Sequence, residues 1–212
     1  MKWTCLPRLN VLGLRTLGLN IPRLSAVLLT ALLLTGCISM PKSHLVTMAP
    51  GVTLQLTAPP AALQMQTKTQ LIEAQFDGKT QSLLAQVEFT ETEIKLVAMT
   101  PSGIPLFDVL WSVTDEAVIH QYVPVPGLDI SYVIADLQWV NWPLAQLQSA
   151  TNGSFKEKFS NNTGQTATDW TRTLTLNGQV VLTVEKFDNR YILQHLLRDY
   201  QITITELSKV SL

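Results

Sequence analysis

Short segments in which apolar and polar side chains alternate dominate the chain from residue 64 onward, and turn-forming residues separate them. Alternation with a period of two places every second side chain on the same face of a β-strand. The short breaks, among them Asn177-Gly178, are typical of antiparallel hairpins. The pattern therefore predicts strands in sequence order over residues 64–76, 80–90, 94–100, 105–113, 117–123, 170–176, 179–187, 191–196 and 200–207.

The strands before residue 124 have a consistent apolar face, which we expect to point into an interior. It consists of Leu83, Ala85, Val87 and Phe89 in one strand and of Phe107, Val109, Trp111 and Val113 in another. Five further apolar residues point the other way: Leu84, Val97, Met99, Leu106 and Leu110. Whether another element covers that second side is left open by the pattern.

Residues 127–150 show helical periodicity instead, with Asp129 placed to cap the first turn and Pro143 forcing a break or restart. The polar residues 151–169 indicate either a mobile loop or a weak edge strand. An apolar helix needs an apolar surface to cover. The elements together predict a mainly β domain, a strongly curved antiparallel sheet or half-open barrel with a helical lid over its open mouth.

The N-terminal segment carries a basic region followed by an apolar run of 11 residues from Leu24 to Leu34. Its basic residues are Lys2, Arg8, Arg15 and Arg23, and none of its residues is acidic. This order is typical of an export signal. A transmembrane helix is the alternative, but it requires roughly 20 apolar residues. The run ends at Leu34-Thr35-Gly36-Cys37, which resembles the lipobox of bacterial lipoproteins.

The lipoprotein resemblance implies that residues 1–36 are removed and that Cys37 is acylated, with palmitate as a typical chain. Two or three acyl chains hold a protein in a membrane almost permanently. Ile38 in the following position implies sorting to the outer membrane, with the protein on its periplasmic face. We expect residues 37–51, including a solvated His44, to form the lipidated N-terminus and a tether, and residues 52–212 to form the domain.

The charge of the mature chain argues against nucleic acid as a partner. The signal holds four of the 15 basic residues, so 11 remain against 16 acidic residues, a net charge of about −5. Nucleic-acid binding requires basic surfaces. The signal also removes Cys5, and acylation of Cys37 leaves no thiol for a disulfide, a metal or catalysis.

A second resemblance rests on Thr100-Pro101-Ser102-Gly103 with Leu106-Phe107, and on Ala135-Asp136-Leu137-Gln138-Trp139 with Trp142-Pro143. These motifs resemble the domain-of-unknown-function lipoproteins that accompany aryl-polyene biosynthesis clusters, which are similar to the lipoprotein carriers LolA and LolB. The resemblance covers about residues 63–207. It implies a half-open barrel of eleven strands, plugged by helices, whose apolar cavity takes up acyl chains, and a LolA-like carrier as a further partner.

One position departs from that pattern. LolB-like proteins present an exposed, membrane-probing leucine where this chain has Ser102, and Ile104 is the nearest apolar substitute. Ile104 is either a membrane-probing residue or an ordinary hairpin residue. The resemblance therefore supports lipid holding more strongly than lipid insertion.

Candidate lipid-binding residues are the large apolar side chains of the inner strand face and of the helix: Phe107, Trp111, Leu137, Trp139, Val140 and Trp142. Large aromatic residues also form ordinary protein cores, which is the alternative for each of them. The sequence contains no Gly-x-Ser-x-Gly motif, no His-Glu-x-x-His motif and no glycine-rich phosphate loop. His120, His195 and Asp136 have more ordinary structural interpretations than catalytic ones.

The sequence thus predicts a non-catalytic lipoprotein, without a cofactor or metal, that binds acyl chains or a polyene lipid in an apolar cavity and takes part in transfer to the outer membrane. One alternative is a scaffold with a filled core that binds a protein partner. A thioesterase or acyltransferase is a third hypothesis.

Overall fold

The computed structural model describes residues 44–159 and 169–211. The chain divides into two compact units, residues 1–40 and 41–212, and all described residues belong to the second. The predicted signal and Cys37, the predicted acylation site, lie outside the described residues.

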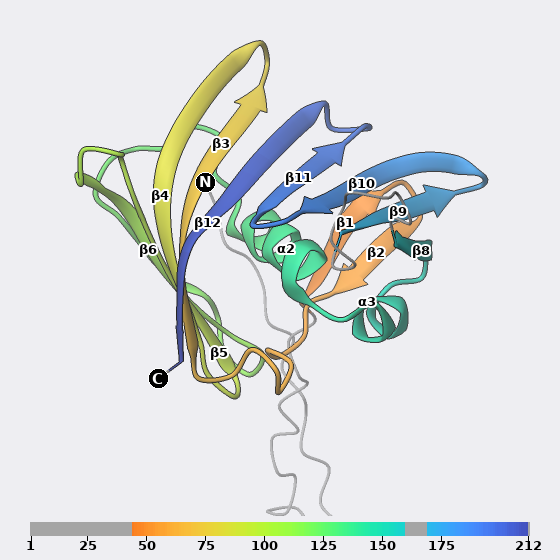
Figure 1. Cartoon of the computed structure of the whole chain (residues 1–212), viewed down its shortest axis with the longest axis horizontal. Helices are drawn as coiled ribbons and strands as arrows, with labels where there is room; N and C mark the ends of the chain where they lie inside the picture. The colour runs from red at the N-terminus through yellow and green to blue at the C-terminus, as the bar shows by residue number, and fades with distance from the viewer. Residues whose placement is uncertain (1–43, 160–168, 212) are drawn as a thin grey trace, which may run out of the picture. The chain divides into compact units, whose positions relative to one another are not determined.

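Ten strands of the described part form one antiparallel sheet, in the order β7-β6-β5-β4-β3-β12-β11-β10-β9-β8 (Figure 1). Their bounds are β3 Gln66–Phe76, β4 Lys79–Phe89, β5 Glu93–Met99, β6 Pro105–Ser112, β7 Val118–Gln121, β8 Ser154–Phe159, β9 Trp170–Leu176, β10 Gln179–Phe187, β11 Arg190–His195 and β12 Tyr200–Ser211. All neighbours are consecutive in sequence except β12, which pairs with β3. The fold class and the hairpin order predicted from the alternation are confirmed.

Two helices follow β7: α2 spans Ile130–Asn141 and α3 spans Leu144–Ala150. The predicted cap is present, because the Asp129 side chain accepts a hydrogen bond of 2.9 Å from the backbone N–H of Ser131. Pro143 stands between the helices, since it lacks the N–H that a continuous helix requires at that position. Figure 1 shows α2 lying across the concave side of the curved sheet.

The predicted tether is partly wrong. Residues Leu45–Ala49 and Val52–Gln55 form strands β1 and β2, a hairpin separate from the large sheet. Val46 and Met48 on β1 are buried. The hairpin turns at Pro50-Gly51, where Gly51 has a φ of +78° that residues other than glycine rarely adopt. The ring of His44 packs against Trp111, with ring centroids 5.6 Å apart, instead of projecting into solvent.

The sequence left open the structure of residues 151–169 and whether another element covers the outer side of the sheet. Of the alternatives for residues 151–169, the edge strand is present as β8, and residues 160–168 lie outside the described part. On the outer side of the sheet Val97 is 39% exposed, and Leu84, Met99, Leu106 and Leu110 are half-buried. No element of the described chain therefore seals that side.

The large sheet does not close into a barrel, because β7 and β8 are its two edges. The strand number implied by the LolA and LolB resemblance was eleven, whereas the described sheet has ten strands and the β1–β2 hairpin stands apart. Curvature and the helices, not closure, give the domain its interior.

Candidate functional site

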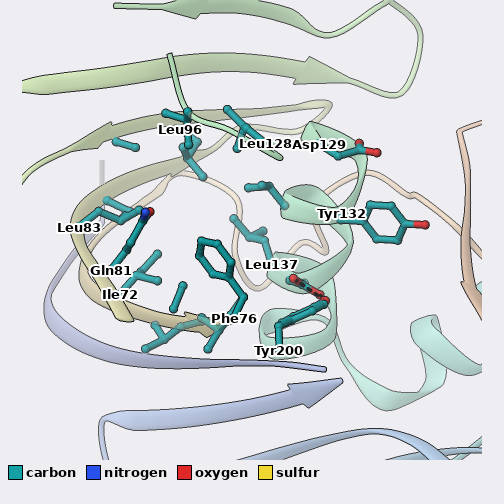
Figure 2. Close-up of a pocket in the computed structure, with 18 of the residues that line it drawn as sticks. Ile72, Phe76, Gln81, Leu83, Leu96, Leu128, Asp129, Tyr132, Leu137 and Tyr200 are labelled. Carbon is teal, nitrogen blue, oxygen red and sulfur yellow. Dashed lines mark hydrogen bonds between the residues drawn. The ribbon is translucent and has the colours of Figure 1, made fainter. Parts of the chain in front are cut away.

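A cavity of about 390 Å³ lies between α2 and the half of the sheet formed by β3, β4, β5, β6 and β12. This volume is in the range of roughly 300–1,000 Å³ found for small-molecule sites. Most lining side chains are aliphatic or aromatic, and Figure 2 shows Ile72, Phe76 and Leu83 facing Leu137 of α2 across the space. The charged lining residues are Asp129, Asp136 and Arg198, and Arg198 lies two residues before Tyr200. The uncharged polar residues Gln70, Gln75, Gln81 and Asn141 line other parts of the wall.

The pleat of the sheet explains the apolar wall. Register places Ile204 of β12 opposite Ile72 of β3, and Ile72 opposite Leu83 of β4, so the three side chains form one row on the inner face. All three line the cavity. The alternation that predicted the strands therefore also produces the apolar surface.

Small side chains explain why space is left. Ala85 of β4 lies opposite Ala98 of β5, and Ala74 of β3 lies one row beyond Ile72. Each of the three alanines lines the cavity and contributes only a methyl group to it. A larger side chain at any of these positions would occupy part of the cavity.

Asp136 and Tyr200 form a buried polar pair on the wall of the cavity. The Tyr200 hydroxyl lies 2.8 and 2.9 Å from the two carboxylate oxygens of Asp136 (Figure 2). Burial raises the pKa of the Asp136 carboxyl to about 7, although the hydrogen bond from Tyr200 and the charge of Arg198 act in the opposite direction. Near neutral pH this carboxyl exchanges between its protonated and ionised forms.

His195 lies behind this pair, with its ring 5.3 Å from that of Tyr200. It is fully buried, and burial together with the charge of Arg198 lowers its pKa to about 4. The imidazole is therefore neutral near pH 7. His120, in contrast, is exposed on the outer side of the sheet, where its Nδ1 lies 2.9 Å from a carboxylate oxygen of Asp108.

Only two of the six residues predicted to bind lipid line this cavity, namely Phe107 and Leu137. Trp111, Trp139, Val140 and Trp142 are buried in the packed core instead. Trp139 lies against Phe155, with ring centroids 4.8 Å apart, and Trp142 donates through Nε1 to the Thr57 hydroxyl at 3.0 Å. Helix α2 is buried on both faces, so its apolar pattern alone did not separate cavity from core.

Several residues that shape the cavity were not among the predicted site residues. Ile72 and Leu83 could have been found from the inward parity of their strands. Tyr200 and Arg198 carried no such signal, because they lie at and just after the turn between β11 and β12 and reach α2 only in the folded domain.

The predicted membrane-probing loop, residues 100–104, lies at one end of the strands. Antiparallel order places the turns after β3, β5 and β11 and the loop after β7 at this same end of the sheet. Phe76, Leu128 and Arg198 line the cavity from this end. Ile104 is 56% exposed and Leu197 is 55% exposed at this end of the strands, whereas Tyr122, 60% exposed, donates its hydroxyl to Asp108 on the outer side of the sheet. Apolar side chains are therefore exposed at the end of the strands where the cavity also ends.

The loop itself is a compact turn. The Ser102 hydroxyl lies 2.8 Å from that of Thr100, which also accepts a hydrogen bond of 3.0 Å from the backbone N–H of Ile104. Gly103 has a φ of +86°. Ser102 is thus engaged within the turn, and Ile104 is its exposed apolar residue.

In the described part of the chain, no helix has the length and apolar character needed to cross a membrane.

Residues 67–208, more than half of the chain, match the family described as "Protein of unknown function (DUF3261)", and the chain belongs to this family. Among solved structures, it is similar to a putative outer membrane lipoprotein-sorting protein domain from Vibrio parahaemolyticus. The identity is 7% and the TM-score 0.35, over 68% of this chain and 84% of the other. No curated protein matches the chain.

Proposed function

We propose that this member of the DUF3261 family is a non-catalytic lipid-binding protein of the bacterial envelope, which holds an acyl chain in the cavity between α2 and the sheet. The observation that carries the proposal is the cavity itself, about 390 Å³ with walls formed mainly by aliphatic side chains. A buried methylene group contributes roughly 0.8 kcal/mol, so an acyl chain in such a space gains affinity with each carbon that leaves water.

The core argues for a binding protein over a scaffold with a filled interior. In a filled core, large side chains would occupy the space beside α2. Here Trp111, Trp139 and Trp142 pack elsewhere, and alanines face α2 across the gap. The wall left open is apolar, which suits a hydrophobic ligand and offers little to a protein partner.

The titratable groups support a non-catalytic role. His120 lies on the outer side of the sheet with Asp108, and His195 is fully buried behind Tyr200. Asp136 reaches the cavity, where its carboxylate accepts a hydrogen bond from the Tyr200 hydroxyl. Burial and the charge of Asp136 raise the pKa of Tyr200, which opposes ionisation of this hydroxyl to a nucleophile.

The proposal also includes a membrane anchor for the protein and a route by which its lipid ligand is exchanged. Acyl chains on Cys37 would tether the protein to the periplasmic face of the outer membrane. The exposed Ile104 and Leu197 at the end of the strands near the cavity would contact lipid, and a LolA-like carrier would deliver the ligand. The ligand would be either the acyl chains of a lipoprotein or a polyene lipid.

The central test is mass spectrometry of lipid extracted from the purified protein, combined with displacement of a fluorescent fatty acid. We expect a defined co-purified lipid and saturable binding of the probe. A folded protein that yields no lipid and shows no saturable binding would refute the proposed function.

The anchor is tested separately with Cys37→Ser. Acylation of the sulfur precedes cleavage in lipoproteins of this kind, so the variant should remain uncut and unlabelled by radioactive palmitate. Normal processing and membrane retention of Cys37→Ser would refute the anchor while leaving the cavity untouched.

A further inference from the structure

The cavity has a single cationic side chain on its described wall, Arg198 in the turn between β11 and β12. Its guanidinium carbon lies 3.3 Å from the centroid of the Tyr132 ring. Tyr132 is itself fixed, because its hydroxyl donates a hydrogen bond of 2.9 Å to the backbone carbonyl of Thr47 on β1. Stacking on a fixed ring holds the guanidinium plane while leaving its edges free to donate hydrogen bonds.

Arg198 has no ion-pair partner among the residues that the structure describes. The two carboxylates on the cavity wall are already engaged: Asp129 caps α2 through Ser131, and Asp136 accepts from Tyr200. Arg198 stacks on Tyr132 and lines the cavity with Asp136 and Tyr200, so its charge lies at this end of the cavity. Its charge opposes the rise in the pKa of Asp136 and adds to the fall in the pKa of His195.

The rest of the wall gives the complementary half of the site. Beyond Tyr200 the cavity continues along the apolar Ile72, Leu83 and Leu96 (Figure 2), and its polar side chains there, Gln70, Gln81 and Asn141, are uncharged. A ligand that matches both parts has an apolar chain with one charged end. Because the acidic side chains are engaged and the guanidinium donors are free, the charge that complements this end is negative.

We infer that the ligand is a single-chain anionic amphiphile, whose chain fills the cavity and whose carboxylate or phosphate group is bound by Arg198. This inference rests on the proposed function, since it names the class of molecule that the cavity holds. Tyr132 acts as a positioning residue for the guanidinium. The edges of the guanidinium can contact two oxygens of a carboxylate or phosphate at once.

The experiment uses the full chain in its native membranes and a hexadecanoic acid analogue that carries a photoreactive diazirine. Labelling of the protein is competed with unlabelled hexadecanoate, hexadecyl phosphate, hexadecanol and hexadecyltrimethylammonium. These competitors share one chain and differ in the head, so the comparison isolates the charge. Hexadecanoate and hexadecyl phosphate distinguish between the two anionic groups.

Arg198→Gln is compared with Arg198→Lys and with Arg190→Gln, a matched change at an exposed arginine of β11 that does not line the cavity. We expect Arg198→Gln to raise the half-maximal concentration of at least one anionic competitor roughly three- to tenfold, as for a partly exposed charge pair. Hexadecanol should compete equally in all proteins. Arg198→Lys should keep only part of the discrimination, because it retains the charge but loses the bidentate contact and the stacking on Tyr132, and Arg190→Gln should keep all of it.

Equal competition by hexadecanoate, hexadecyl phosphate and hexadecanol in the unmodified protein would overturn the inference and leave the proposed function intact. A preference for the trimethylammonium head, or an equal loss in Arg190→Gln and Arg198→Gln, would also overturn it. Labelling that no competitor reduces in any protein would instead refute the proposed function. Circular dichroism of the purified variants, compared with the unmodified protein, separates loss of binding from loss of folding.

Discussion

The two faces of α2 are both buried, yet one is packed and the other borders a cavity. On the packed face, Ile134 and Trp139 are fully buried, and Trp139 contacts Phe155 of β8. On the other face, Val133 and Leu137 look across open space to the alanines of β4 and β5. The helix supplies apolar side chains to both sides. The size of the residues on the facing strands therefore decides whether a helix face stabilises the fold or forms a binding site.

The largest effect that would test this comparison is on stability. We expect Trp139→Ala to lower the free energy of unfolding by roughly 3–5 kcal/mol, because it removes a large buried side chain from close packing. Leu137→Ala should cost clearly less, because Leu137 already borders empty space. Urea unfolding of both variants measures the difference. Equal costs would show that the two faces are packed alike.

The free energy of unfolding should depend on pH through Asp136, which lies on the cavity face of α2. The pKa of Asp136 is raised to about 7 in the folded state, so the folded protein binds a proton that the unfolded chain has released between about pH 4 and 7. The stabilisation is complete below about pH 4 and is lost as the pH rises toward 7, with a total of up to about 4 kcal/mol. Asp136→Asn should remove this slope.

The contribution of His195 to stability changes with pH in the opposite direction, and the two contributions must be measured separately. Its pKa is lowered to about 4, so its contribution is present above about pH 6.5 and is lost as the pH falls toward 4. The difference in unfolding free energy between the unmodified protein and Asp136→Asn, measured from pH 4 to 8, isolates Asp136. A difference that does not change with pH would contradict the assignment.

Filling the cavity should affect binding more than folding. Ala74→Trp places a large side chain in the space, and we expect it to weaken binding of a fluorescent fatty acid at least about tenfold, because the chain loses its apolar contact area. Glu73→Trp is the matched control, because Glu73 is exposed and points to the opposite face of β3 from Ala74. Similar affinities of the two variants would mean that the ligand binds elsewhere.

The smallest expected effect concerns the turn between β5 and β6. An apolar side chain that becomes fully buried in lipid gains roughly 1.5–3 kcal/mol, and an exposed turn realises part of it. Ser102→Leu should therefore increase the fraction of the domain lacking residues 1–37 that co-sediments with vesicles, and Ile104→Asp should reduce it. Val180→Asp, at a half-exposed position of β10, is the control. If Ser102→Leu and Ile104→Asp behave like the control, the loop is not a membrane contact.

Local patterns were sufficient for most elements. Strands β9 and β10 begin and end at the predicted residues, and Asp129 and Pro143 set the start of α2 and its separation from α3 as expected. The β1–β2 hairpin was missed although it carries a short alternation and the Pro50-Gly51 turn. Two prolines and the nearby anchor motif suggested a tether, and the burial of Met48 depends on the rest of the domain.

The sequence by itself determined the mainly β class, the order of the hairpins, the single helical insertion and the apolar inner face, because periods of two and 3.6 residues, caps and turns are set by neighbours in the chain. The tertiary structure alone decided that β12 pairs with β3, that Trp111, Trp139 and Trp142 belong to the core, and that Asp136, Tyr200 and Arg198 meet at one end of a cavity. Those relations join residues far apart in sequence. They depend on which faces meet when the sheet curves around α2, and that is a property of packing and not of any local pattern.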